Sequence, residues 1–459
     1  MLTALAAVSS LSVSVFLLLC GNGLLFALLP LRAEVEGFSD LSVGLLGSGY
    51  FLGMMIGCLV SPSLIRFAGH VRAFAAASAI MTVAPLIHVL APEPVFWIVI
   101  RVLAGLCQAV LFAVIESWMN EKADNTYRGQ ILAIYNVINY AGLSLGQQFL
   151  RLYEPSGHEL FLLGAILLSL AAVPVALTRS AAAALPESPR LRLVWLYRLS
   201  PVGVLTAAGV GIANGSFFSF APLFGSEIGL SSSQIASFFS LSLAGAVITL
   251  WPLGRLSDMI DRRYVIIGTC LIAALVGWLL FSVATTQGPD ALLLIYALGL
   301  CFGAFAMPIY ALAGAHAADF AEKEELVEVA TGLLLVYTLG ATIGPTLVSL
   351  LNETVSPLAL FAFIGAVHMS MALVAAWRMT RREALPADER DAFIAVPRTS
   401  PGAIELAPST VSYDRHDHDV PFPAEAEPLY MPIDPEATSH TSHDTPGTDT
   451  PDQDKTKNA

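Results

Sequence analysis

Two charged side chains, Arg101 and Glu116, lie in one apolar segment at a spacing that would place them on one side of an α-helix. The residues at this spacing are Arg101, Gly105, Gln108, Phe112 and Glu116. An arginine in such a segment can hold an anionic group of a solute, and a glutamate shielded from water can exchange a proton. The stripe is expected to bind a substrate or to couple its movement to protons. The alternative is structural: an interhelical ion pair for Arg101 and a salt bridge with a loop arginine for Glu116.

Neutral hydrogen-bonding side chains occur in other apolar segments. Their polar groups are costly to bury without a partner, so we expect them to face a polar cavity or a bound solute. Together with Arg101, Gln108 and Glu116, the residues expected to contact a substrate are Asn22, Asn139, Asn214 and Tyr310. For the tyrosine, packing is an equal alternative, because aromatic side chains in apolar helices often serve the core.

A dense group of charges separates two long uncharged segments. The stretch "GRLSDMIDRR", residues 254–263, contains two aspartates and three arginines. Arginines in such a place anchor a chain at the anionic inner surface of a membrane. Two arginines would suffice for an anchor, so the aspartates predict an additional role in hydrogen bonds between helices.

The composition predicts the elements that position these residues. Hydrophobic residues make up 56% of the 459, charged residues only 13%, and the mean hydropathy is +0.70. Uncharged runs of about 20 residues, the length that crosses about 30 Å of hydrocarbon, predict an all-α membrane protein rather than a β-barrel. We expect twelve transmembrane helices, near 5–31, 41–65, 73–91, 95–118, 129–151, 159–178, 201–222, 233–253, 264–285, 291–314, 328–351 and 357–378.

The basic residues predict the orientation of these helices. If the N-terminus is cytoplasmic, twelve lysines and arginines before residue 378 lie in cytoplasmic loops and only Arg32 and Arg151 lie on the other side. This asymmetry follows the positive-inside rule, so both termini are expected in the cytoplasm.

The two halves of the chain resemble one another. "RVLAGLC" at residues 101–107 matches "IYALGLC" at 295–301, and "NYAGLSLG" at 139–146 matches "YTLGATIG" at 337–344. We therefore expect a six-helix bundle at 1–178, a cytoplasmic linker at 179–200 and a second bundle at 201–378. Paired halves of this kind are typical of transporters, in which the substrate binds between them.

The remainder, residues 379–459, is expected to be a disordered acidic tail in the cytoplasm. It contains 16 acidic and 7 basic residues and is rich in proline, serine and threonine. Its tract His416-Asp417-His418-Asp419 is a weak metal motif in a flexible segment, so no metal site is predicted.

The sequence shows none of the motifs that would indicate an enzyme or an ATP-driven pump. No lysine follows a glycine, which excludes a Walker A loop, and no HExxH zinc helix is present. We therefore expect a secondary transporter without a cofactor. Its expected partners are a small organic solute, protons or another coupling ion, and the lipid bilayer, with no nucleic acid. We expect it to act as a monomer in the bacterial inner membrane.

Several motifs resemble the major facilitator superfamily. "GRLSDMIDRR" is similar to its motif A, and "RVLAG" at residues 101–105 to its motif B. The combination of "LLPLRAE", "GSGYFLGMMIG", "ESWMN" and "LWPLGRLSD" is most similar to the YcaD-type transporters of bacteria.

The resemblance implies twelve helices, alternating access and a cytoplasmic gate. In this gate Gly254 would allow close helix approach. Asp258 would accept hydrogen bonds from arginines and face the N-terminus of the helix near 328–351. Arg262 and Arg263 would hold the helix ends, and Glu121 and Arg128 would belong to the same charge network.

The sequence also allows two alternative functions. "LPESPRL" at residues 185–191 and the Glu121–Arg128 spacing also resemble sugar porters, but residues 206–218 lack the glutamine-rich segment of those proteins. The second alternative is a transporter-like sensor that signals through its acidic tail without moving a solute.

Overall fold

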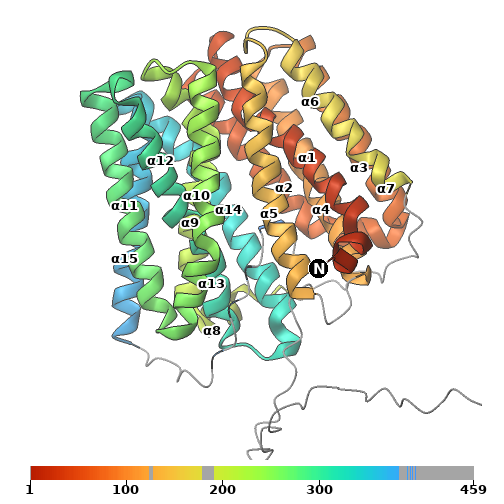
Figure 1. The fold of residues 1–459 in the computed structure, drawn as a ribbon, viewed down its shortest axis with the longest axis vertical. Coiled ribbons are helices and arrows are strands. Elements are labelled where there is room, and N and C mark those ends of the chain that lie inside the picture. Colours follow the sequence, from red (N-terminus) through yellow and green to blue (C-terminus); the bar gives the residue numbers. More distant parts are fainter. Residues whose placement is uncertain are drawn as a thin grey trace, which may run out of the picture. The chain divides into compact units, whose positions relative to one another are not determined.

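A computed structural model describes residues 2–122, 128–177, 191–381, 390, 393, 395, 398 and 399. These residues all belong to one compact unit, Met1–Ser409. The part of the chain so described is helical, with short connections (Figure 1).

The first half of the chain forms seven α-helices and one short 3₁₀ turn. A serine at position 39 caps the second helix by accepting a hydrogen bond from the Ser42 amide, and Gly69, with φ of 80°, separates the second helix from the third. The elements are α1 (Leu2–Val35), α2 (Asp40–Ala68), α3 (His70–Leu90), α4 (Pro94–Lys122), α5 (Arg128–Gln148), η1 (Phe149–Arg151), α6 (Glu159–Leu170) and α7 (Ala172–Ala176).

The second half repeats this pattern after a short connecting helix. Ser231 and Gln234 form a reciprocal capping box at the start of α10, and Pro308 separates α12 from α13. The elements are α8 (Leu193–Leu199), α9 (Pro201–Glu227), α10 (Ser232–Met259), α11 (Arg262–Thr286), η2 (Gly288–Ala291), α12 (Leu292–Ala306), α13 (Ile309–Ala318), η3 (Lys323–Glu325), α14 (Leu326–Thr354) and α15 (Leu360–Met379).

Each major helix pair of the first half has a counterpart in the second. Helices α1 and α5 pack together as α9 and α14 do, α2 and α4 as α10 and α12, and α3 and α6 as α11 and α15. The halves meet along two further pairs, α2 with α14 and α5 with α10; the second pair lies in the centre of Figure 1. This repetition is the arrangement expected of a duplicated six-helix unit.

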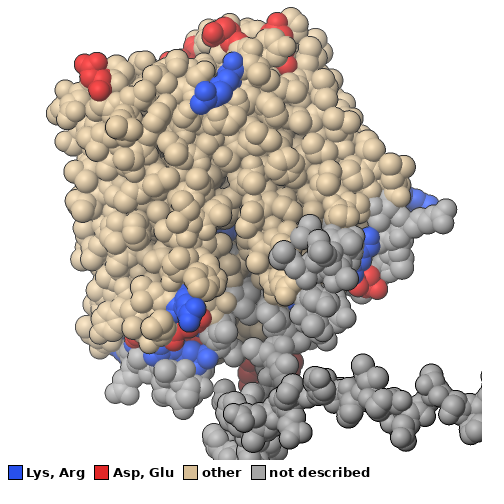
Figure 2. All heavy atoms as spheres, viewed as in Figure 1, with Lys and Arg blue, Asp and Glu red and all other residues tan. Residues whose placement is uncertain are grey.

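Eleven helices in the described part of the chain are long and apolar enough to cross a membrane. The predicted span at 129–151 is the one not among them: its helix, α5, carries Asn136, Asn139, Gln147 and Gln148. It nevertheless packs between α1 and α10 within the bundle. Figure 2 shows a wide band almost free of charge between charged groups at the two ends of the helices, as a lipid-facing surface requires.

Glycines bring helix backbones into direct contact within each half. A Cβ at Gly105 of α4 would overlap the Tyr50 carbonyl oxygen of α2, and one at Gly303 of α12 would overlap the Ser242 carbonyl of α10. Both positions therefore exclude any larger residue. The consequence is that the helices of each half are held together closely.

Candidate functional site

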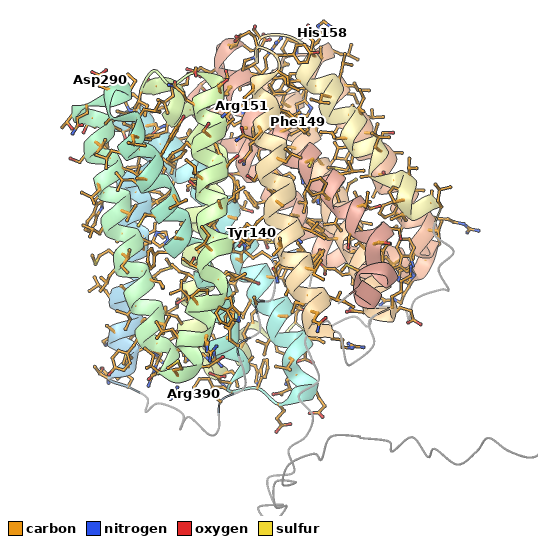
Figure 3. The ribbon with its side chains drawn as sticks, in the orientation of Figure 1. Tyr140, Phe149, Arg151, His158, Asp290 and Arg390 are labelled. Atoms are coloured by element: carbon orange, nitrogen blue, oxygen red, sulfur yellow. The ribbon has the colours of Figure 1, made fainter. Side chains whose placement is uncertain are left out.

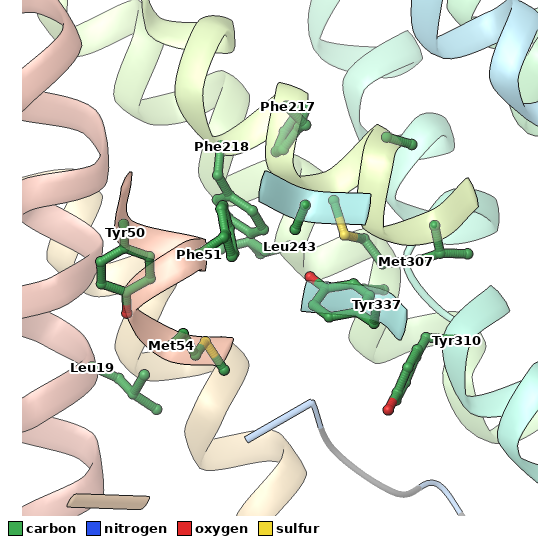
Figure 4. Close-up of a cluster of buried hydrophobic side chains, with 14 of the residues drawn as sticks. Leu19, Tyr50, Phe51, Met54, Phe217, Phe218, Leu243, Met307, Tyr310 and Tyr337 are labelled. Atoms are coloured by element: carbon green, nitrogen blue, oxygen red, sulfur yellow. The ribbon is translucent and has the colours of Figure 1, made fainter. Parts of the chain in front are cut away.

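A cavity lies between the two halves, with about 890 Å³ of empty volume including the part open to solvent. Side chains of both halves border it (Figure 4), and most are apolar or aromatic. They include Leu19, Asn22, Phe26, Tyr50, Phe51, Met54, Phe112, Asn136, Asn139, Tyr140 and Leu143 from the first half, and Phe218, Leu250, Met307, Tyr310, Ala311 and Tyr337 from the second. A cavity of this size and composition suits a small organic solute.

The first-half wall carries the amides. Asn22 Nδ2 donates a hydrogen bond to the Tyr50 hydroxyl at 3.0 Å. Asn139 Nδ2 donates to the Tyr135 carbonyl at 2.8 Å, which fixes the side chain on α5. The predicted residues Asn22 and Asn139 thus both line the cavity.

The second-half wall is aromatic. The rings of Tyr310 and Tyr337 lie edge to face with their centroids 5.2 Å apart. In the same half, Phe217, Phe239 and Phe302 form a buried aromatic cluster. The predicted residue Tyr310 thus lines the cavity and also packs against a neighbour.

Arg101 lies behind the first-half wall. Its guanidinium carbon is 4.2 Å from the centroid of the Tyr50 ring and 5.4 Å from that of Phe26. The side chain borders a small adjacent pocket, while Tyr50 and Phe26 border the main cavity. Arg101 therefore does not line the cavity itself but packs against two aromatic rings that do. The spacing of residues in the sequence did not indicate this role.

Glu116 is fully buried at the base of α4. Its Oε1 accepts hydrogen bonds from the Tyr135 hydroxyl at 2.7 Å and from the Thr399 hydroxyl. The second donor comes from the tail that follows α15. Two hydroxyl donors thus hold the carboxylate beside the cavity, since Thr399 is itself a cavity residue.

Gln108 and Asn214 are also buried, but neither is among the residues that line the cavity. In the described structure, both amide atoms of Gln108 and Nδ2 of Asn214 lack a hydrogen-bond partner. Burying such groups is costly, so a change in helix position that gives them partners would be favourable.

Hydrogen bonds between the halves gather at the end of the molecule marked by Arg151 in Figure 3. Gln148 Nε2 donates to the Ala236 carbonyl at 3.0 Å and to the Ser240 hydroxyl at 2.5 Å, and Arg151 Nη2 donates to Ser237 at 2.6 Å. We use the name closed end for Gln148, Arg151, Ala236, Ser237 and Ser240. At the opposite end of the same helix pair, a pocket separates α5 from α10.

The charged cluster after α10 is a buried ion network. Arg262 is 1% exposed and donates to both Asp319 oxygens at 2.7 and 3.1 Å and to Asp258 at 3.0 Å. Asp258 accepts the hydrogen bond from an arginine that was expected of it, and Phe393 N–H of the tail also donates to its Oδ1 at 2.9 Å. Its expected position facing the N-terminus of α14 stays a prediction. The ring of Phe393 occupies the space beside Gly254.

Arg263 pairs with Asp261, which caps α11. The Asp261 carboxylate accepts from the Arg263 amide at 2.9 Å and from Arg263 Nη2 at 2.6 Å. Burial alone would raise the pKa of Asp261, but the hydrogen bonds and charge of Arg263 outweigh it and hold that pKa below its usual range. Asp261 lies between two spans, so this pair stabilises a helix start at the membrane surface.

Asp261→Asn is expected to destabilise the protein by about 1 kcal/mol at neutral pH, since it removes the charge from a capping pair. Because the folded pKa is depressed, the advantage of the wild type is present above the unfolded value of about 4 and is lost as pH falls through the folded pKa. Thermal unfolding in detergent between pH 7 and pH 3 measures this difference. A difference between the two proteins that persists unchanged at pH 3 would contradict the assignment.

Glu121 and Arg128 flank residues 123–127, which lie outside the described part of the chain. Glu121 is exposed at the end of α4, and Arg128 begins α5. Their role in a gate stays a prediction. The sugar-porter-like stretch at 185–191 and the tract at 416–419 also lie outside the described residues, except for Leu191.

Five tail residues contact the helices or the ends of helices, which the sequence did not predict. The sequence predicts no fixed structure after residue 379, yet the structure places Arg390, Phe393, Ala395, Arg398 and Thr399 against the helices. Three of them, Ala395, Arg398 and Thr399, line the cavity. Their only sequence signal is an apolar and basic stretch inside an otherwise acidic tail.

Related proteins identify the family. The family model for the Major Facilitator Superfamily matches residues 11–317 and 204–400. An uncharacterized MFS-type transporter of Yersinia pestis (strain Pestoides F) is 28% identical over 369 residues, covering 78% of this chain and 94% of the relative. The uncharacterized MFS-type transporter YcaD of Escherichia fergusonii is 26% identical over 353 residues, covering 76% and 90%.

Solved structures share the fold. A crystal structure of the D-xylose-proton symporter superposes with a TM-score of 0.65 at 15% identity, covering 83% of this chain and 99% of that one. The nucleoside transporter NupG superposes with a TM-score of 0.62 at 15% identity, covering 82% and 100%. The chain therefore belongs to the Major Facilitator Superfamily and is a multi-pass protein of the bacterial inner membrane.

Proposed function

We propose that the protein is a secondary active transporter that moves a small organic solute by alternating access and is driven by protons. One observation carries this proposal. The cavity between the halves is lined by both, and α5 and α10 are hydrogen-bonded at the closed end while a pocket separates them at the other. This is the arrangement of a transporter open to one side.

The positive-inside rule supports an inward-facing state. The pocket between α5 and α10 lies toward the start of α5 and the end of α10, where the basic residues gather. We propose that both termini and this opening are cytoplasmic. In the opposite state the closed end would separate, and the cluster of Asp258 and Arg262 would contribute to a cytoplasmic closure.

Glu116 is the proposed proton carrier. It is a fully buried carboxylate beside the cavity, held by hydroxyl groups from α5 and the tail. A buried carboxylate binds a proton when solvent or a charged partner is withdrawn and releases it when they return. Movement of the second half and of the tail relative to α4 and α5 during alternation would change these surroundings.

Glu116→Gln is expected to abolish proton-driven accumulation, because glutamine keeps the hydrogen-bonding shape and cannot carry the proton. A thermal-shift screen of small organic solutes on the purified protein first identifies the solute. Proteoliposomes with an imposed pH gradient then measure its accumulation, and exchange without a gradient measures alternation alone. We expect exchange to persist in the variant while accumulation is lost.

Glu154→Gln, an exposed position in the loop after η1, is the matched control and should retain both activities. Accumulation by Glu116→Gln at the wild-type level would refute the proton role. If wild-type liposomes exchange none of the solutes that raise the melting temperature, the transport proposal itself fails.

A further inference from the structure

The tail after α15 enters the cavity that we propose for the solute. The described tail residues form hydrogen bonds to both halves. The Asn136 amide on α5 donates to the Ala395 carbonyl at 2.8 Å, and Phe393 N–H donates to Asp258 on α10 at 2.9 Å. Arg390 Nη1 donates to the Ile260 carbonyl at 2.8 Å. We call Phe393, Ala395, Arg398 and Thr399 the tail plug.

The tail plug reaches deep between the halves. Arg398 Nη2 donates to the Tyr140 hydroxyl at 3.4 Å, and Figure 3 places Tyr140 midway between Arg151 and Arg390. Beside Arg398, Thr399 is 6% exposed and donates to Glu116. The plug therefore occupies the depth at which transporters of this architecture hold their substrate.

The chemistry around Arg398 is that of a cation site. Its guanidinium carbon lies 5.6 Å from the centroid of the Tyr337 ring, and the Tyr140 oxygen accepts its hydrogen bond. Aromatic faces and oxygen acceptors attract a cation. A carboxylate also lies close by, because the next tail residue, Thr399, donates a hydrogen bond to Glu116. The remaining wall is apolar, with Leu143, Leu250 and Met307 among its residues.

The guanidinium is incompletely satisfied. Arg398 Nη1 is buried without a hydrogen-bond partner among the described residues. A ligand whose charge is spread over an aromatic body would need fewer hydrogen bonds in this place, so it would compete well with the arginine.

We propose that the tail plug is a tethered competitor for the solute site and that this site binds organic cations with an apolar body. The proposal rests on the proposed function, because it assigns the occupant and the substrate class of the same cavity. A segment tethered at millimolar effective concentration weakens the apparent affinity of a competing ligand by about tenfold when its own dissociation constant is about 100 µM.

Ethidium, a planar aromatic cation whose fluorescence rises in apolar surroundings, is the probe. Fluorescence titration of the full-length protein in detergent measures its dissociation constant. Phe393→Ala, which weakens the plug without changing charge, and Arg398→Ala are both expected to lower this constant about tenfold. Arg381→Ala, which removes an exposed charge just after α15, is the matched control and should leave the constant unchanged.

A synthetic peptide of residues 390–401 tests the competition directly. It should displace ethidium from the Phe393→Ala protein, and the same peptide with Arg398→Ala should not. Equal ethidium affinity in wild type and Phe393→Ala would overturn the plug. If the anionic dye anilinonaphthalene sulfonate binds the Phe393→Ala protein as tightly as ethidium and is displaced by the peptide, the cation class is wrong.

These binding measurements in detergent do not depend on flux. If they follow the expected pattern while liposomes exchange no solute, the transport proposal fails and the tail proposal stands. If exchange occurs and Phe393→Ala changes neither the affinity nor the rate, the tail proposal fails and transport stands.

Discussion

Arg101→Ala is expected to reduce the initial rate of solute uptake by about 100-fold while the protein remains folded. The arginine holds Tyr50 and Phe26, which line the cavity, through contacts of 4.2 and 5.4 Å between its guanidinium carbon and the ring centroids. Two desolvated contacts of this kind contribute together about 1–4 kcal/mol, and about 2.7 kcal/mol corresponds to 100-fold. Uptake into proteoliposomes below the KM measures the effect.

Arg101→Lys should recover part of the rate, because the charge remains but the planar group that stacks on the rings is lost. A positioning role predicts a rise in KM in both variants at a near wild-type melting temperature. Arg66→Ala, at the exposed end of α2, is the matched control for loss of an arginine. An Arg101→Ala protein that fails to fold would show instead that the arginine is architectural.

Asp319→Ala is expected to destabilise the folded protein by about 3–5 kcal/mol. Arg262 and Asp319 are 1% and 3% exposed at their side chains and share two hydrogen bonds. Removing Asp319 takes away the buried counter-charge of Arg262, and the more exposed Asp258 compensates the guanidinium less well. Thermal or denaturant unfolding in detergent measures the loss.

The double variant Arg262→Met with Asp319→Leu separates the two causes. It removes both charges and keeps apolar volume, so its stability should lie closer to the wild type than that of Asp319→Ala. A double variant as unstable as the single one would show that the cluster acts through contacts other than this ion pair.

The sequence predicted the helices well because their determinants are local. Apolar length and the break at Gly69 depend only on neighbouring residues, and the predicted spans agree with the observed helices to within several residues. The repeat around Gly105 also indicated two similar halves. Helix α5 was predicted as a span and is observed as a helix, but the polar residues with which it faces the cavity lower its hydropathy below that of the other spans.

The site was only partly predictable, because it depends on which helix faces meet. Asn22, Asn139 and Tyr310 line the cavity as expected, whereas Gln108 on the Arg101 stripe does not. The partners of Asp258 depend on a tail more than a hundred residues away in the sequence, and no local pattern gives such a contact. The polar and acidic composition of that tail predicted disorder. Its few apolar residues are too sparse to predict a contact with the helices.

The closed end has a consequence for how the balance between states responds to temperature. Its groups are amides, hydroxyls and a guanidinium, which water can replace as partners when the halves separate. Exposing polar groups lowers the heat capacity, so the opening of this polar seam should contribute a negative change in heat capacity. The ratio of the two proposed states should then follow a curved van't Hoff plot rather than a straight line.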